Sequence, residues 1–124
     1  MIQEHKALLL KDLSARLSYH VRLKVWLKDG TTEEGFLDLK HNYGDVLRDA
    51  FYYNEIIDIK PYLFPLSSMT EEQKQEYQHI TERWMYDPFY SIGNSIDWLN
   101  AHYFDYRGLI LRKLAIDATG LNIY

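Results

Sequence analysis

The nine residues 20–28, "HVRLKVWLK", decide how the rest of the chain is interpreted. Aliphatic side chains fill every second position and charged or aromatic ones the positions between: Val21, Leu23, Val25 and Leu27 against Arg22, Lys24, Trp26 and Lys28. A period of two is typical of a strand with one buried face. The Asp29-Gly30 pair that follows is a strong turn signal, so residues 33–40 are predicted to return as the second strand of an antiparallel hairpin.

A helix is predicted before this hairpin and more strands after it. Within residues 3–17, Leu10, Leu13 and Leu17 fall at i, i+3 and i+7, with Leu9 beside them, which is the spacing of one helical face. After the hairpin, strands are predicted at residues 45–53 and 55–63, and prolines 61 and 65 are expected to bound the sheet because proline cannot donate to it. About four short antiparallel strands fit either a partly open, SH3-like barrel or a flat meander with a helix packed across it.

The sequence of the second half of the chain predicts two or three helices. Residues 65–88 carry capping-box spacing, from Ser68 with Glu71 or from Thr70 with Gln73, and their apolar stripe consists of Tyr77, Ile80 and Trp84. Asp87-Pro88 is expected to end this helix.

After that helix we predict a loop and one further short helix. The loop covers residues 88–94, and the helix runs from Ser95 through Leu99 and Tyr103 until Gly108 breaks it. The segment 109–124 is mixed, with a last helical turn and then an extended stretch. The predicted fold class is therefore α+β, and residues 1–124 are expected to form a single domain.

Composition removes several classes of protein. The 124 residues contain no cysteine, which excludes disulfides and thiolate chemistry. The net charge of −4 gives no general attraction to phosphate backbones. No apolar run is long enough to cross a membrane, and residues 1–13 lack the features of a signal peptide, so a cytoplasmic protein without membrane contact is expected. Phosphate-loop, dinucleotide-binding and metalloprotease motifs are missing, and the five histidines are scattered, so neither a cofactor nor a metal is expected.

Three blocks resemble a known family: "IKPYLFPLSSMTEEQKQEY" (59–77), "SIDWLNAHYFDYRGLI" (95–110) and "LAIDATGLNIY" (114–124). They are similar to a family of short uncharacterised proteins from gut anaerobic bacteria and their phages or mobile elements. The likeness covers roughly the last half of the chain, and the N-terminal helix and hairpin match more loosely. Leu111, Arg112 and Lys113 depart from the pattern. The resemblance implies a bacterial or phage origin and a cytoplasmic setting, and it transfers no site residue.

One cluster of polar residues could take part in catalysis. His102 and Asp105 are three residues apart and would share a face if the helix continued that far, with Arg107 nearby to hold an anion. No nucleophile motif accompanies them. Asp105 also begins "DYRG", where its side chain would cap a turn. A structural polar cluster is therefore the favoured interpretation, with ligand contact second and a small enzyme third.

Two surfaces could bind a partner. Arg22, Lys24 and Lys28 flank Trp26 on the outward face of the first strand, which suits a base stacked between phosphate contacts. The favoured interpretation, however, is that the C-terminal helices cover Trp26 and that the cations only solvate the sheet edge and deter edge pairing.

Eleven tyrosines and a second group of aromatics are expected mainly to fill the core and its boundary, and where several are exposed together they would mark a protein-binding surface. Tyr86, Phe89 and Tyr90 are the candidates for that surface. The leading functional hypothesis is a non-enzymatic binding or adaptor module for a protein partner, and nucleic-acid binding is the alternative.

Overall fold

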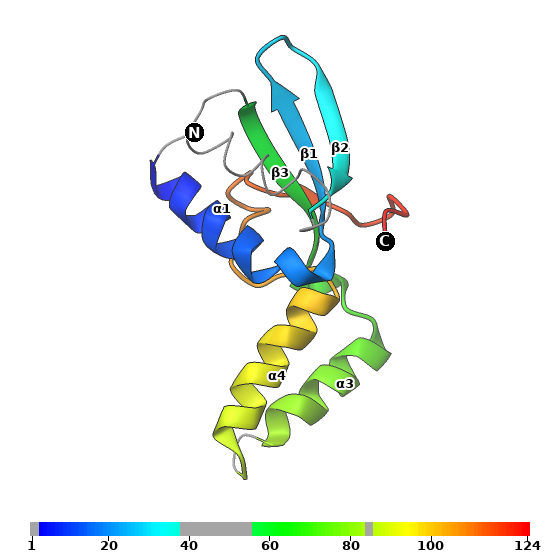
Figure 1. Ribbon diagram of the computed structural model, residues 1–124. Coiled ribbons are helices and arrows are strands. Elements are labelled where there is room, and N and C mark those ends of the chain that lie inside the picture. The colour runs from blue at the N-terminus through cyan, green and yellow to red at the C-terminus, as the bar shows by residue number, and fades with distance from the viewer. Residues whose placement is uncertain (1–2, 38–55, 84–85) are drawn as a thin grey trace.

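Three antiparallel strands form the centre of the computed structural model, which describes residues 3–37, 56–83 and 86–124. They are β1 (Arg22–Leu27), β2 (Thr32–Phe36) and β3 (Ile56–Pro65), in the order β2-β1-β3 (Figure 1). Val21, Leu23 and Val25 are buried, as their period-two spacing predicted. Gly30 turns the chain at φ +88°, a conformation that favours glycine, so the predicted hairpin is confirmed.

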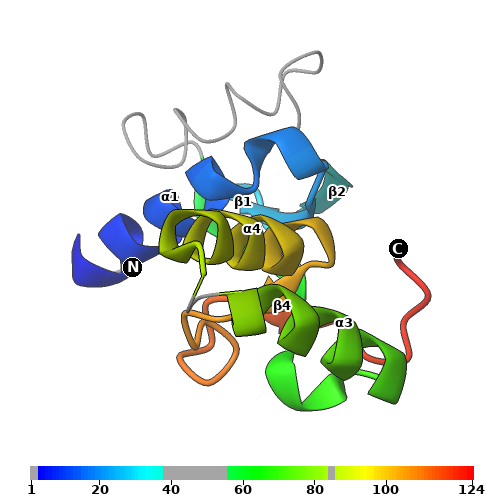
Figure 2. The same ribbon diagram turned by 90° about the horizontal axis from the view of Figure 1, so that it is seen from below.

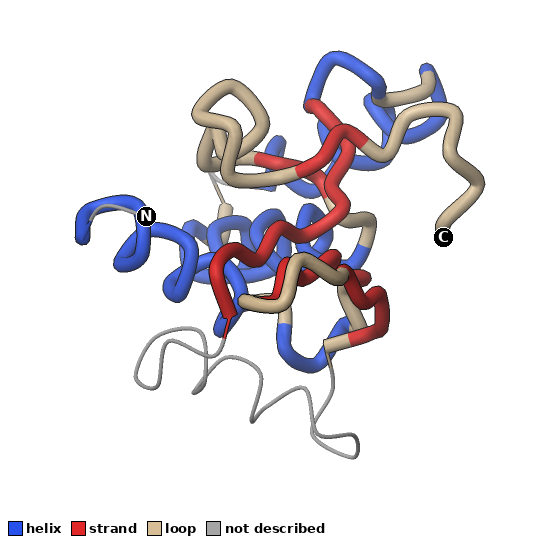
Figure 3. The backbone as a smooth tube through the Cα atoms, turned by 90° about the horizontal axis from the view of Figure 1, so that it is seen from above, coloured by secondary structure: helices blue, strands red, loops and turns tan. Residues whose placement is uncertain are grey.

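The sheet is mixed, whereas an all-antiparallel one was predicted. Two short strands, β4 (Phe104–Asp105) and β5 (Ile116–Asp117), pair in parallel with the last four residues of β3. Seen from above in Figure 3, β1 and β2 lie on one side of β3, and the loops that carry β4 and β5 lie on the other. The predicted strand at 45–53 lies outside the described residues.

Of the two prolines predicted to bound the sheet, Pro65 does end β3, but Pro61 does not. Pro61 lies inside the strand, opposite Leu23 of β1, and it is buried. A proline removes a single donor. The neighbouring residues of β3 make the remaining bonds to β1 and to the C-terminal strands, so the strand continues to Pro65.

Helix α1 (Gln3–Ala15) packs across the inner face of this sheet (Figure 1). Leu9 and Leu13 are fully buried against the odd-numbered residues of β1 and against Ile59 of β3. The predicted stripe was partly wrong, because Leu10 is 36% exposed. The face that is buried instead carries two charged residues, Asp12 and Arg16.

Helices α3 (Glu71–Glu82) and α4 (Pro88–Ala101) form an antiparallel pair that projects away from the sheet (Figures 1 and 2). Thr70 accepts from the backbone N–H of Gln73, and the Gln73 side chain accepts from the backbone N–H of Thr70, so this capping box is the one used. A second apolar cluster, built on Trp98, Leu99 and Phe104, fills the base of the pair.

The predicted loop at 88–94 was wrong, because these residues are the first turns of α4. Asp87 is the N-cap and accepts from the backbone N–H of Tyr90, while Pro88 occupies the first turn, where its missing N–H costs nothing. The helix also ends earlier than predicted, at Ala101. Tyr103 has φ +62°, which turns the chain out of the helix toward β4.

A buried ion pair joins α1 to the C-terminal segment. The guanidinium of Arg16 donates to both carboxylate oxygens of Asp12, at 2.9 and 3.2 Å, and to the carbonyl oxygen of Phe104 at 2.6 Å. Arg107 donates to Asp12 from the other side at 2.8 Å. The side chains of Asp12 and Arg16 have no exposed surface, so each charge depends on these partners for its solvation.

We expect Asp12→Ala to lower the free energy of unfolding by about 3–5 kcal/mol, because it leaves two guanidinium groups without their shared carboxylate. Lys11→Ala, on the exposed neighbouring position of the same helix, should change it by less than about 0.5 kcal/mol. Urea unfolding measures both variants. Equal effects of the two substitutions would show that the ion pair contributes no net stability.

Candidate functional site

The structure separates the three residues of the candidate polar cluster. His102 follows the end of α4, so it shares no helical face with Asp105. Its ring stacks on Trp98 at 4.1 Å between centroids, and its Nδ1 donates to the Trp98 carbonyl oxygen at 2.8 Å. Among the described residues no hydrogen bond joins His102 to Asp105.

Asp105 and Arg107 instead hold the backbone. The buried carboxylate of Asp105 accepts from the amides of Leu109 (3.0 Å) and Ile110 (2.9 Å), and from that of Arg107 at 3.3 Å. The Arg107 side chain is engaged with Asp12 and with the Tyr106 hydroxyl. Both groups therefore have structural partners, and neither is aimed at a common substrate position with His102.

His102 does line a small pocket. Phe64, Ser68, Thr70, Gln73, His102, Phe104, Thr119 and Gly120 surround a volume of about 250 Å³. These residues supply hydroxyl and amide groups but no carboxylate that could orient the imidazole. General acid–base chemistry at His102 would therefore lack the second group of a pair.

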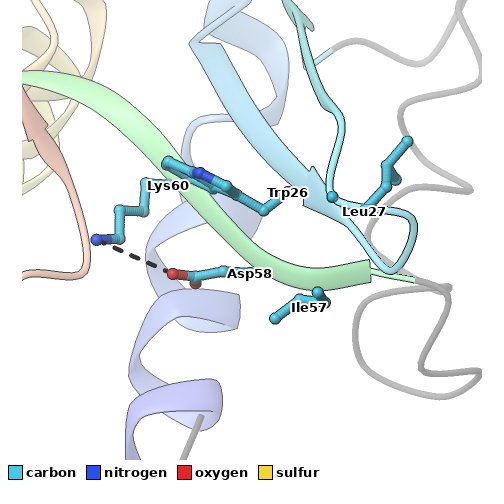
Figure 4. Close-up of a pocket in the computed structure, with 6 residues that line it drawn as sticks. Trp26, Leu27, Ile57, Asp58 and Lys60 are labelled. Carbon is cyan, nitrogen blue, oxygen red and sulfur yellow. Dashed lines mark ion pairs between the residues drawn. The ribbon is translucent and has the colours of Figure 1, made fainter.

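The outer face of the sheet, opposite α1, carries Trp26 among cations. The ammonium groups of Lys24 and Lys60 lie 5.4 and 5.5 Å from the centre of its ring, which is cation–π distance. Figure 4 shows the ring lying across β3 beside Lys60, with α1 behind the sheet. Trp26, Leu27, Gly30, Ile57, Asp58 and Lys60 line a shallow pocket of about 360 Å³ here, the Trp26 pocket.

The other two predicted cations, Arg22 and Lys28, are not placed beside Trp26. Arg22 shares the face but donates to Glu34 at 3.0 Å, and its guanidinium lies over the ring of Phe36. Lys28 is exposed beyond the end of β1, outside the residues that line the Trp26 pocket. The structure thus keeps Lys24 and Trp26 of the predicted set together and adds Lys60, which register places directly opposite Lys24.

A second shallow pocket meets the first at β3. His5, Ile57, Asp58, Arg112, Lys113 and Leu114 line a volume of about 290 Å³, the Arg112 pocket. Ile57 and Asp58 belong to both pockets. Sequence reasoning missed Arg112 and Lys113 here, because they are some 50 residues from β3 along the chain and carry no motif.

Hydrogen bonding on the outer face shifts two pKa values. The bonds that Glu34 accepts, from the Tyr62 hydroxyl first and from Arg22 second, hold the pKa of its carboxyl below the usual range. Burial of the Tyr62 hydroxyl, and next its bond to Glu34, raise the pKa of Tyr62 to about 12. This interaction fixes β2 to β3 across β1.

The predicted protein-binding aromatics gather where α3 and α4 are joined. Tyr86 and Phe89 are 91% and 89% exposed. Tyr90 is 38% exposed and its ring is covered by the guanidinium of Arg83 at 4.4 Å. All three predicted side chains therefore lie at the far end of the helical pair, away from the sheet (Figure 1).

Two further kinds of feature are absent from the described part of the chain. It holds no group of three His, Asp or Glu side chains placed to bind a metal ion. None of its helices combines the length and the apolar character that a membrane span requires.

Alkaline pH tests the Tyr62–Glu34 contact. Tyrosine in the unfolded chain ionises near pH 10.0, and Tyr62 in the folded chain near 12. The stability that this difference supplies is complete below pH 10 and is lost as pH rises toward 12. We expect the free energy of unfolding to fall less steeply over this range in Tyr62→Phe than in the wild type, as urea titrations at each pH would show. Parallel curves would contradict the assignment.

Comparison of the chain with family models, with curated proteins and with solved structures found no match. Its family and origin therefore stay predictions.

Proposed function

We propose that this chain is a non-enzymatic binding module that docks on a protein partner through the α3–α4 pair, in the cytoplasm of a bacterium or in a phage setting. The near-complete exposure of Tyr86 and Phe89 carries this proposal. Large apolar side chains gathered at an exposed site are typical of interaction surfaces. Tyrosine and other aromatics are also enriched among residues that dominate binding energy.

The apolar surface continues from the tip along α4. Phe89, Ile92 and Ile96 fall at i, i+3 and i+7 and are all exposed. The face of α4 toward α3 is a different one, where Trp98 meets Tyr77 and Ser91 donates to the Ile80 carbonyl oxygen. A surface helix normally has one apolar face, which packs against the rest of the protein. The second apolar face of α4, formed by Phe89, Ile92 and Ile96, is therefore available for a partner.

Charge indicates what kind of partner fits. Residues 71–101 contain six acidic and two basic side chains, which accounts for the whole net charge of −4. The remaining residues contain twelve of each sign. The partner we propose therefore has an apolar groove with a basic rim. The same charge opposes pairing of two copies through this surface.

The test compares two exposed apolar sites of equal exposure. Tyr86→Ser with Phe89→Ser removes the tip, and Leu111→Ser removes a side chain that is also 91% exposed but lies in the C-terminal segment. We expect a partner isolated from the native host, then purified, to bind the tip variant at least about 30-fold more weakly, because a single hot-spot residue contributes about 2 kcal/mol or more. Binding to Leu111→Ser should equal that of the wild type.

Two results would contradict the proposal. One is a partner that binds the tip variant with unchanged affinity. The other is affinity that does not fall with salt, since an acidic surface on a basic rim must be screened. Calorimetric titration at two ionic strengths measures both, and far-ultraviolet circular dichroism checks that the variants are folded.

A further inference from the structure

We infer that the outer face of the sheet and the adjoining edge of β3 bind single-stranded nucleic acid, with one base stacked on Trp26 and the phosphates held by Lys24, Lys60, Arg112 and Lys113. This site is independent of the protein-docking surface, because it lies on β1, β3, the start of α1 and the C-terminal segment and uses none of α3 or α4.

The aromatic platform is the first element of the site. Trp26 is half-buried, so its position is fixed, and the pocket beside it leaves part of the indole accessible. Its register partners are Thr32 of β2 and Asp58 of β3, both smaller than the ring. A planar base can therefore approach the indole, and base–aromatic stacking tolerates any base.

Cations surround this platform, and part of their charge is offset. Glu34 of β2 lies directly opposite Lys24 in the strand register, and its carboxylate interacts electrostatically with that ammonium group. Lys60 Nζ lies 3.9 Å from the Asp58 carboxylate, a long contact that Figure 4 marks with a dashed line. Within the described residues Arg112 and Lys113 form no ion pair with an acidic side chain.

The two pockets give the strand a path. The Trp26 pocket and the Arg112 pocket share Ile57 and Asp58, so they adjoin at β3. At these positions no described strand lies on the side of β3 away from β1, because β4 and β5 pair only with its last four residues. A flexible chain can thus pass from Trp26 over the edge of β3 to Arg112 and Lys113.

Single-stranded nucleic acid matches this arrangement better than other anions. It alternates planar groups with phosphates, and the face alternates an aromatic ring with cations. A duplex hides its bases inside the stack, so it could use the cations but not Trp26. Nothing on the face selects a 2′-hydroxyl, so DNA and RNA of the same sequence type should bind with similar affinity.

The experiment is fluorescence anisotropy with labelled oligo-dT and oligo-rU of about 15 nucleotides, at several salt concentrations. Four phosphate contacts predict a slope of about −2.8 for log K against log salt, and Arg112→Gln with Lys113→Gln should reduce it to about −1.4. The matched control is Lys11→Gln with Lys74→Gln, which changes the net charge equally on α1 and α3.

Trp26→Ala should weaken binding about 5- to 150-fold, and Trp26→Phe, which keeps a ring and the buried stem, should restore most of it. The Phe89→Ser variant should bind as the wild type does, which separates this site from the docking surface. The wild type should bind a duplex of the same length more weakly than the single strand, by the same factor as Trp26→Ala weakens single-strand binding.

Three outcomes would overturn the inference. The first is that the wild type does not bind the oligonucleotide at low salt. The second is that the Lys11/Lys74 control loses as much affinity as the Arg112/Lys113 variant. The third is that a poly-glutamate peptide binds more tightly than the oligonucleotide and displaces it. The last would identify the face as a site for acidic protein segments.

Discussion

The fold depends on a pair of charges buried where an apolar pair would be expected. Asp12 and Arg16 lie on the sheet-facing side of α1, in line with Leu9 and Leu13, and both are removed from water. The desolvation of two such groups is repaid only when their hydrogen bonds are nearly complete. Here the Phe104 carbonyl oxygen and the Arg107 guanidinium supply the additional partners. The charge pair thereby specifies where the C-terminal segment must lie on the helix.

This attachment determines where the two proposed binding surfaces lie. Phe104 begins the strand that pairs with the end of β3, and β3 contributes to both apolar clusters, through Ile59 in one and Phe64 in the other. The α3–α4 pair is thus anchored at its base, carries a net negative charge along its length and exposes aromatic side chains at its far end. The residues outside 71–101 have no net charge, but cations gather around Trp26 on the outer face of the sheet. The two surfaces proposed as binding sites therefore differ in charge and lie on different elements.

Local patterns predicted the elements well and their connections poorly. Alternation identified β1, and the Thr70–Gln73 spacing identified the start of α3, because both depend on near neighbours in sequence. Pro88 was interpreted as a helix end, although proline is equally suited to a first helical turn, and the preceding Asp87 was the available signal for a cap.

Contacts between distant segments had no local signal. The Asp12–Arg16 spacing looks like an ordinary surface pair at i and i+4, and only the burial of the same helix face shows otherwise. Strand register brings Lys60 beside Trp26, and a turn in which Lys113 has φ +61° brings Lys113 to the neighbouring Arg112 pocket. The cationic face predicted from β1 alone was therefore incomplete.

Arg16 holds the C-terminal segment against α1. Native-state hydrogen exchange in Arg16→Met tests this role. The amides of Leu109 and Ile110, which Asp105 binds, should lose far more protection than the amide of Val25 in the middle of β1. A uniform loss across these amides, or unchanged protection at Leu109 and Ile110, would contradict the claim.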